Sequence, residues 1–265
     1  MREDALIGID IGTTNLKFAA VAPGGRTLAV VQRPMRVDRP APGEAEFHLG
    51  ALLEGLRDGL GALAGRLPPG ARLLALGVDS IGESVVPLDA RGEPLGPCTT
   101  WFDRRVWVSP GYAGLPRQRR YDLTGMVEDD IYSVHRIAWF RAAAPQVARR
   151  VARWGNVADF AVLHLCGRLA AHPSLAARTG LLDRVSGDWS DELLAAGGLT
   201  RADLPEVLPA GQVAGGLRPD VAGATGLPAG MPVVHAGHDH PCALAGCGLS
   251  TPGGWLDSTG TAMAV

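Results

Sequence analysis

The segment Gly8-Ile9-Asp10-Ile11-Gly12-Thr13-Thr14-Asn15-Leu16-Lys17 joins two apolar runs through a turn that is rich in hydrogen-bond donors. The runs cover residues 6–11 and 16–21, and they predict two strands paired as a tight β-hairpin. Because Gly12 has no Cβ, a ligand can approach the backbone of the turn closely. Asp10 is the second-last residue of the first run, so a carboxylate stands beside these donors.

The chemistry of the turn favours a phosphate ligand. The N–H groups and hydroxyls of Thr13 and Thr14 can surround a phosphate, as successive donors do in anion-binding turns. Asp10 would repel that phosphate directly, so we expect it to hold Mg²⁺ through water. Lys17, the single lysine beside 24 arginines, stands next to the turn and is a further candidate phosphate contact. A plain hairpin without a ligand is the alternative.

The turn differs from two widespread phosphate motifs. It has neither the Gly-x-x-x-x-Gly-Lys-Ser/Thr pattern of a Walker loop nor the Gly-x-Gly-x-x-Gly pattern of a dinucleotide-binding fold. It resembles instead the first phosphate motif of the actin-like ATPase superfamily, which includes sugar kinases, actin and the heat-shock chaperone ATPases. This resemblance implies an α/β fold with a ribonuclease-H-like core, in which a mixed sheet is flanked by helices.

Composition excludes several classes of function. The chain has 265 residues, 46% of them hydrophobic, and a net charge of −2, which favours a globular protein and gives no electrostatic case for nucleic acid or an acidic membrane. The sequence has no apolar run long enough to span a bilayer and no signal-peptide pattern. The four cysteines lack Cys-x-x-Cys spacing, so we expect reduced thiols in a cytoplasmic protein.

The rest of the chain alternates between strand and helix patterns. The order strand-strand-strand-helix-strand at the N-terminus matches the ribonuclease-H-like core with its parallel return. Further strands are predicted for residues 27–31, 73–78, 84–88, 232–236 and 254–257. Helices are predicted for residues 48–67, 132–153 with a break near Pro145, 158–169 and 241–248.

A second group of polar residues lies between residues 232–236 and 241–248, in the sequence His-Ala-Gly-His-Asp-His-Pro-Cys. Asp239 follows a strand and opens a helix, so it lies at the sheet edge where α/β proteins bind ligands. The positive end of the helix dipole keeps it ionised, which suits a general base that takes a proton from a substrate hydroxyl. Two alternatives stay open: a zinc site with its histidines and Cys242, and a simple helix N-cap.

A third turn repeats the chemistry of the first one. The segment Leu256-Asp257-Ser258-Thr259-Gly260-Thr261 again runs from apolar residues into glycine and hydroxyls. Two such turns facing each other could hold one polyphosphate between them, with Gly260 and Thr261 as contacts. An ordinary β-turn is the alternative here.

Taken together, these motifs resemble the FGGY family of carbohydrate kinases. The resemblance implies that Asp239 is the catalytic aspartate and that Gly260-Thr261 is the second phosphate motif, 22 residues after it. The residues implied to contact a sugar come from Gly77-Val-Asp-Ser-Ile-Gly-Glu83, Trp101-Phe-Asp103-x-Arg105 and the start of a helix: Glu83, Trp101, Asp103 and Arg136, together with Asp239. Arg136 stands where relatives place a lysine, and it either lines the sugar pocket or pairs on a helix surface.

Two departures from the family pattern concern domains and substrate. The resemblance covers residues 1–265 as the N-terminal domain, and the C-terminal nucleotide-binding domain expected after Val265 is missing from this chain. Glycerol kinases carry Arg-Glu and xylulose kinases Met-His where this chain has Gly82-Glu83, which weakens both substrates. The His-Asp-His form around Asp239 also differs from the Gly-Asp-Gln of glycerol kinases.

The resemblance therefore implies an ATP- and Mg²⁺-dependent kinase that phosphorylates a hydroxyl of a small-molecule sugar or polyol. A truncated, catalytically weak sugar-binding module of the same fold is the alternative, favoured by the missing domain. An ATPase of the chaperone or actin type is a third reading, which Asp239 at a helix start and Trp101-x-Asp103-x-Arg105 disfavour. The oligomeric state stays open, with a homodimer as one option.

Overall fold

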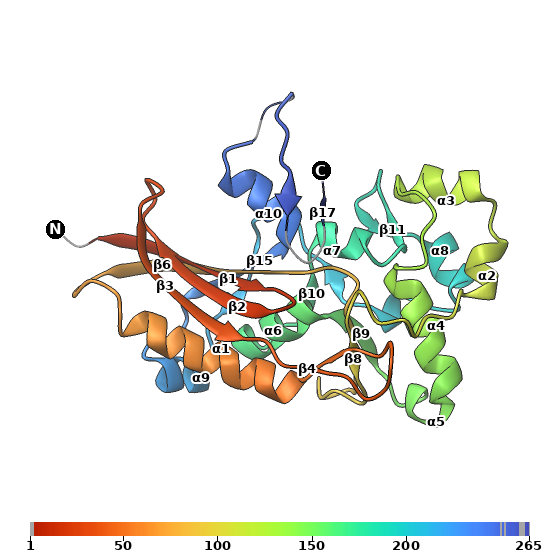
Figure 1. The fold of residues 1–265 in the computed structure, drawn as a ribbon, viewed down its shortest axis with the longest axis horizontal. Coiled ribbons are helices and arrows are strands. Elements are labelled where there is room, and N and C mark those ends of the chain that lie inside the picture. Colours follow the sequence, from red (N-terminus) through yellow and green to blue (C-terminus); the bar gives the residue numbers. More distant parts are fainter. Residues whose placement is uncertain (1–2, 250, 252, 260–262, 265) are drawn as a thin grey trace.

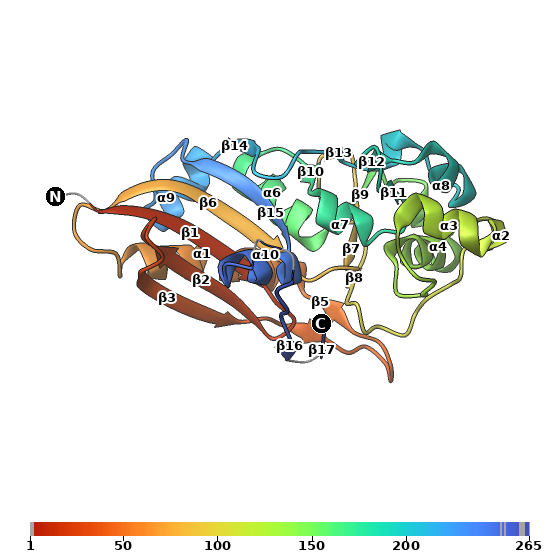
Figure 2. The same ribbon diagram turned by 90° about the horizontal axis from the view of Figure 1, so that it is seen from above.

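A six-stranded mixed sheet forms the centre of the protein in a computed structural model, which describes residues 3–249, 251, 253–259 and 263–264. Its strand order is β14-β15-β6-β1-β2-β3 (Figures 1 and 2). The strands are β1 (Asp4–Ile11), β2 (Asn15–Val21), β3 (Thr27–Pro34), β6 (Arg72–Ser80), β14 (Val213–Gly216) and β15 (Pro232–His238). This architecture confirms the expected mixed sheet flanked by helices.

Register in the sheet brings the carboxyl ends of three strands together. β1 pairs antiparallel with β2, and it pairs parallel with β6, which in turn pairs parallel with β15. Asp10 is thereby opposite Lys17 on one side and Asp79 on the other. The predicted hairpin and its parallel return are both present. They place the turn at residues 12–14, called the phosphate-type turn below, at the end of the sheet where β6 and β15 also finish.

One face of the sheet is covered by α1 (Leu49–Ala64), α6 (Val157–Cys166) and α9 (Pro219–Thr225), while α10 (Asp239–Gly246) lies on the other side (Figure 1). Burial alternates along the strands, because successive side chains point to opposite faces. The close packing of α1 on β2 depends on Gly59, since a Cβ there would overlap the ring of Phe18. Asp10 and Asp79 belong to the face opposite to these helices.

Short helices form a second, smaller cluster at the end of the molecule away from β3 (Figure 2). Its aromatic core includes Tyr112, Phe140, Trp154 and Trp189. The helices are α2 (Pro110–Gly114), α3 (Arg117–Thr124), α4 (Ser133–Ala143), α5 (Pro145–Ala148), α7 (Pro173–Ala177), α8 (Asp191–Ala196) and the 3-10 turn η1 (Arg201–Asp203).

Short strands join the two parts of the molecule. They are β4 (Val37–Asp38), β5 (Glu46–Phe47), β7 (Val85–Leu88), β8 (Cys98–Thr99), β9 (Arg153–Asn156), β10 (Ala170–Ala171), β11 (Leu182–Asp183), β12 (Asp188–Trp189) and β13 (Glu206–Val207), with β16 (Ser258–Thr259) and β17 (Met263–Ala264) near the C-terminus. No helix among the described residues is both long enough and apolar enough to cross a lipid bilayer.

The structure corrects three element predictions. Residues 254–257 are not a strand; they pair with no strand among the described residues, and Trp255 is 81% exposed. The helix predicted for residues 132–153 ends at Ala148, because residues 153–156 pair with β7 as a strand. The helix predicted from Pro241 begins two residues earlier, at Asp239, since proline is tolerated throughout a first helical turn, where N–H groups have no helical partner.

Candidate active site

Three carboxylates meet at the carboxyl edge of the parallel strands. Asp10 and Asp79 are direct neighbours in the β1–β6 register, and Asp239 follows the last residue of β15. The edge at which parallel strands end is where α/β proteins bind their ligands. The expected juxtaposition of Asp10 with Asp239 therefore includes a third acid that lies between their strands.

The proximity of these three acids raises the pKa of the central one, Asp79. Burial, followed by the charges of Asp10 and Asp239, raises the pKa of Asp79 to about 8. Lys17 Nζ donates a hydrogen bond of 2.9 Å to Asp10 Oδ2, which places the single lysine of the chain at this edge. The acids of this cluster thus face one nearby side-chain cation, Lys17, and the remaining negative charge attracts a further cation.

Asp239 occupies the first helical position of α10. Its Oδ1 accepts a hydrogen bond of 2.7 Å from the His240 N–H, and the His238 imidazole Nε2 lies 3.4 Å from the same oxygen. Burial raises the pKa of Asp239, while His240 opposes this rise. The N-cap residue is His238, so Asp239 is not the helix cap. A half-buried carboxylate with a raised pKa has the proton affinity that a general base needs.

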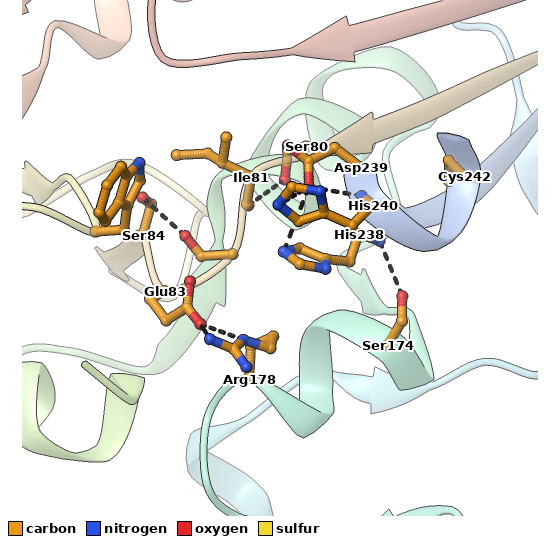
Figure 3. A network of polar contacts seen from close by, with 12 residues as sticks. Ser80, Ile81, Glu83, Ser84, Ser174, Arg178, His238, Asp239, His240 and Cys242 are labelled. Atoms are coloured by element: carbon orange, nitrogen blue, oxygen red, sulfur yellow. Dashed lines mark hydrogen bonds and ion pairs between the residues drawn. The ribbon is translucent and has the colours of Figure 1, made fainter. Parts of the chain in front are cut away.

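Glu83 is the one described non-glycine residue with a positive φ, at 54°. Its side chain is buried and forms an ion pair with the Arg178 guanidinium (Figure 3). Burial raises the pKa of Glu83, and Arg178 acts against it. Non-glycine residues in this region of φ are strained and concentrate at functional sites, so the strain supports the sugar-contact role expected for Glu83.

Trp101 connects the loop after β8 to the phosphate-type turn. Its Nε1 donates to Thr13 Oγ1 at 3.3 Å, across 88 residues of sequence. Arg136 is 3% exposed and donates from its guanidinium to the carbonyl oxygens of Trp101, at 2.6 Å, and Asp103, at 3.3 Å. Arg136 is therefore buried against this loop rather than paired on a helix surface.

Asp103 is placed inside the same loop. Its carboxylate accepts hydrogen bonds from the Arg105 guanidinium and from the backbone N–H groups of Ala45 and Arg105. Although burial opposes ionisation, these donors hold the pKa of Asp103 below its usual range. The Asp103 side chain has no exposed surface, so its present contacts are those that shape the loop.

The phosphate-type turn has the tight geometry that the sequence indicated. The Gly12 N–H donates to the Asn15 carbonyl at 3.1 Å, and a Cβ at Gly12 would lie 3.1 Å from that same oxygen. Thr14 is exposed and Thr13 is partly exposed, so both are accessible to a ligand. Gly260 and Thr261 lie outside the described residues.

Comparison with known proteins assigns this arrangement to a family. The sequence profile of the FGGY family of carbohydrate kinases, N-terminal domain, matches residues 5–246. The chain belongs to the FGGY family. An L-fuculokinase from Salmonella typhi is 29% identical over 94% of this chain and 53% of its own length. A glycerol kinase from Bordetella pertussis is 30% identical over 97% of this chain and 51% of its own.

A solved structure supports the same assignment. The crystal structure of xylulose kinase from Rhodospirillum rubrum superposes with a TM-score of 0.87 at 27% identity, covering 94% of this chain and 52% of that one. The chain thus spans about half the length of the curated FGGY relatives that it matches.

Sequence reasoning gave three polar residues of this site no role in contacts with sugar or phosphate. Asp79 stands in the quoted segment Gly77–Glu83, but its role becomes visible only when β6 is placed in register beside β1. Arg178 pairs with Glu83 across 95 residues, a contact that no local pattern signals. His238 stands beside Asp239, and the departure of His-Asp-His from the glycerol kinase pattern was the available signal.

The described residues give no support to the zinc alternative. No group of three or more His, Cys, Asp or Glu side chains in the described part of the chain is arranged to hold a metal ion. The Cys242 Sγ donates to the carbonyl of Ala236, and burial raises the pKa of this thiol to about 12.

Proposed function

We propose that the protein is a kinase that transfers the γ-phosphoryl group of ATP to a hydroxyl of a sugar or polyol. Asp239 carries this proposal, because it is a half-buried carboxylate at the same sheet edge as Asp10 and the Thr13-Thr14 turn. In the proposed reaction Asp239 accepts the proton of the attacking hydroxyl. Glu83 accepts hydrogen bonds from other hydroxyls of the substrate.

The phosphate end of the site is assigned to the first turn. The N–H groups and hydroxyls of Thr13 and Thr14 orient the β- and γ-phosphates, with Lys17 nearby and Gly260-Thr261 proposed as the second contact. Asp10 is proposed to hold Mg²⁺ through water, and a bound Mg²⁺ would neutralise charge that develops on the phosphates. Positioning and charge stabilisation provide most of the rate in phosphoryl transfer, so no covalent intermediate is needed.

Two residues expected to contact the sugar have a different role in this proposal. Arg136 and Asp103 hold the loop that carries Trp101, because their polar atoms are directed to that loop and its neighbours. Trp101 is then the member of this group that touches substrate. The proposal also includes a second domain that completes the nucleotide site, and a cytoplasmic location, for which the four free cysteines are the support.

A non-catalytic sugar-binding module is the second candidate. Binding would then require Glu83 and Asp239 without transfer of phosphate. ATP consumption separates the two candidates, because a kinase converts ATP to ADP in the presence of its sugar and a binding module does not.

The test is Asp239→Asn in the full-length protein, with glycerol, xylulose and L-fuculose as the substrate panel and ADP release as the readout. Loss of the general base should lower kcat by about 10² or more. Asp58→Asn, at an exposed position of α1, is the matched control and should keep wild-type turnover. Near-normal turnover by the Asp239 variant would remove this residue from the mechanism, and absence of turnover by the wild type on a wider sugar panel would favour the binding module.

A further inference from the structure

The short helix α7 touches both halves of the candidate site. Ser174 Oγ accepts a hydrogen bond of 2.9 Å from the backbone N–H of His238, the residue before Asp239. One helical turn later, the Arg178 guanidinium pairs with Glu83. Arg178 is the C-cap residue that directly follows α7, so the start of this helix contacts the residue before Asp239 and its end contacts the Glu83 carboxylate (Figure 3).

Ser174 is itself fixed by His172. The His172 Nδ1 accepts the N–H of Ser174 at 3.2 Å, so this nitrogen carries no proton. The Ser174 hydroxyl, 2.8 Å from the same nitrogen, therefore donates to it and offers its oxygen to the His238 N–H. The Ser174 hydroxyl thus donates to His172 and accepts from the His238 N–H. Its role toward the segment that carries Asp239 is that of a hydrogen-bond acceptor for the backbone.

The backbone of that segment is pressed against the start of α7. Gly237 has a φ of 107°, a conformation that other residues rarely adopt. A Cβ at Gly237 would overlap His172 Nδ1 and Ser174 Oγ. β15 also shifts register against β6 between His235 and Gly237. The direction in which Asp239 leaves the sheet is thus determined by contact with α7 as well as by the strand itself.

Arg178 is held on its other sides as well. Its guanidinium lies 5.4 Å from the centre of the Tyr132 ring, a cation–π contact. Its Cγ lies against Gly82, where a Cβ would come within 3.3 Å of it. Glu83, with its positive φ, is therefore restrained through an arginine that cannot move freely.

We propose that α7, together with its C-cap residue Arg178, is a positioning element for the reaction: Ser174 sets the place of the general base Asp239, and Arg178 sets the place of the substrate-contacting carboxylate Glu83. This inference rests on the proposed kinase function. Neither residue touches the reacting atoms in this scheme. Ser174 acts through the His238 amide, and Arg178 acts through the Glu83 side chain.

The two roles predict different kinetic losses. Displacement of Asp239 weakens proton removal, which occurs only in the transition state, so removal of the Ser174 hydroxyl should lower kcat by a larger factor than it changes the sugar KM. Displacement of Glu83 weakens a contact present before and during transfer, so loss of Arg178 should raise the sugar KM and leave kcat nearly unchanged. A role in folding alone would not separate kcat from KM in this way.

The first experiment compares Ser174→Ala, Ser174→Thr and the control Ser186→Ala in the full-length protein, on whichever of glycerol, xylulose or L-fuculose the wild type phosphorylates best. Ser174→Ala should lower kcat by about tenfold with the sugar KM within twofold, because small misplacements of a reacting group are costly. Ser174→Thr, which keeps the hydroxyl, should restore most of this loss. Ser186 lies in an exposed turn, so its variant should match the wild type.

The second experiment compares Arg178→Gln with Arg119→Gln, which removes an exposed arginine from its pair with Glu192. Arg178→Gln should raise the sugar KM by about tenfold, as expected for loss of a buried charge partner, with kcat within threefold. The Arg119 variant should leave both constants unchanged. If Ser174→Ala and Arg178→Gln changed kcat by the same factor and the sugar KM by the same factor, the division of roles would be overturned.

A measurement without turnover keeps the inference separate from the proposed function. Amide hydrogen exchange in residues 235–242 should become several-fold faster in Ser174→Ala than in the wild type or in Ser174→Thr, since the His238 N–H loses its acceptor. Unchanged exchange would overturn the positioning role even if no sugar is phosphorylated. Absence of phosphorylation by the wild type, with faster exchange in the variant, would reject the kinase assignment instead.

Discussion

Gly82 shows how one missing side chain shapes the candidate site. A Cβ at this position would lie 3.2 Å from His238 Nε2 and 3.3 Å from Arg178 Cγ, so the imidazole and the arginine stem already fill this space. A long side chain such as the arginine of glycerol kinases would need the space that His238 occupies. Gly82 and His238 are therefore complementary, and together they give the site a shape that differs from one built around arginine.

The first prediction concerns this contact. Gly82→Ala should move His238 or Arg178 by a few tenths of an ångström and lower kcat/KM by about tenfold, since both flank the candidate catalytic groups. Gly114→Ala is the control, because nothing lies within 4 Å of a Cβ there. Steady-state kinetics of both variants with the best substrate would measure the effect. Equal kcat/KM for the two variants would show that His238 and Arg178 yield without consequence.

His172 provides a prediction about acid stability. Burial, and next the neighbouring His235, lowers the pKa of His172 to about 4 from its ordinary value of 6.5. Between these values the unfolded chain takes up a proton that the folded chain refuses, so the free energy of unfolding falls as the pH drops from 6.5 towards 4. His172→Asn keeps a helix-capping acceptor and does not titrate, so this loss should become shallower by on the order of 1 kcal/mol, allowing for partial exposure.

Urea unfolding at several pH values across that window would test the prediction for His172. His48→Asn is the matched control, because His48 caps α1 through the Ala51 N–H as His172 caps α7 through that of Ser174. An identical pH dependence in the wild type and in His172→Asn would show that the neutral imidazole makes no contribution to acid sensitivity.

Individual site residues were predictable where the chemistry is local. The turn at Thr13 and Thr14 and the position of Asp239 at a helix start could be inferred because glycine, hydroxyls and strand ends lie within a few residues of each other. Asp79 and Arg178 could not, because their partners come from elsewhere in the sequence through strand register and tertiary packing. Local structure around a site residue is therefore predictable within one turn, whereas its contacts with distant segments are not.

Among the larger elements, periodicity predicted those packed on the central sheet. The pattern for residues 48–67 gave α1, and the run at residues 73–78 gave β6, because one face of each is buried in the main core. The failures were elements without such a face. Residues 254–257 pair with no strand in the part of the chain that the structure describes, and β9 is defined by pairing with β7, which no local pattern contains.

The packing of α1 on the sheet leads to a stability prediction. Gly59→Ala should destabilise the protein by about 1–3 kcal/mol, because the added methyl group overlaps the buried Phe18 ring. Gly223→Ala in α9 is the matched control, since nothing lies within 4 Å of its Cβ, and it should stabilise by up to about 1 kcal/mol through helix propensity. Denaturant midpoints of the two variants would compare them. A stabilised Gly59→Ala would mean that Phe18 has space to move.

At the scale of the whole molecule, Trp101 joins two distant segments: the loop after β8, which carries Trp101 and Asp103, and the phosphate-type turn. Its indole N–H donates to Thr13 Oγ1 at 3.3 Å, and its carbonyl is held by Arg136 at 2.6 Å. The Thr13 hydroxyl proton thus stays available for a phosphate, while its oxygen is engaged by the loop. A ligand that orders either segment therefore favours the arrangement that the other ligand needs, which is a coupling of the two binding events.

Trp101→Phe tests this coupling because it keeps an aromatic ring and removes the N–H. We expect the sugar-induced gain in affinity for a non-hydrolysable ATP analogue to fall by roughly threefold, the effect of one lost hydrogen bond. By reciprocity, the analogue-induced gain in sugar affinity must fall by the same factor. Calorimetric titration of each ligand with and without the other measures both, and Trp107→Phe, at a residue 53% exposed, is the control. Unchanged coupling in Trp101→Phe would mean that the two ligands communicate through other contacts.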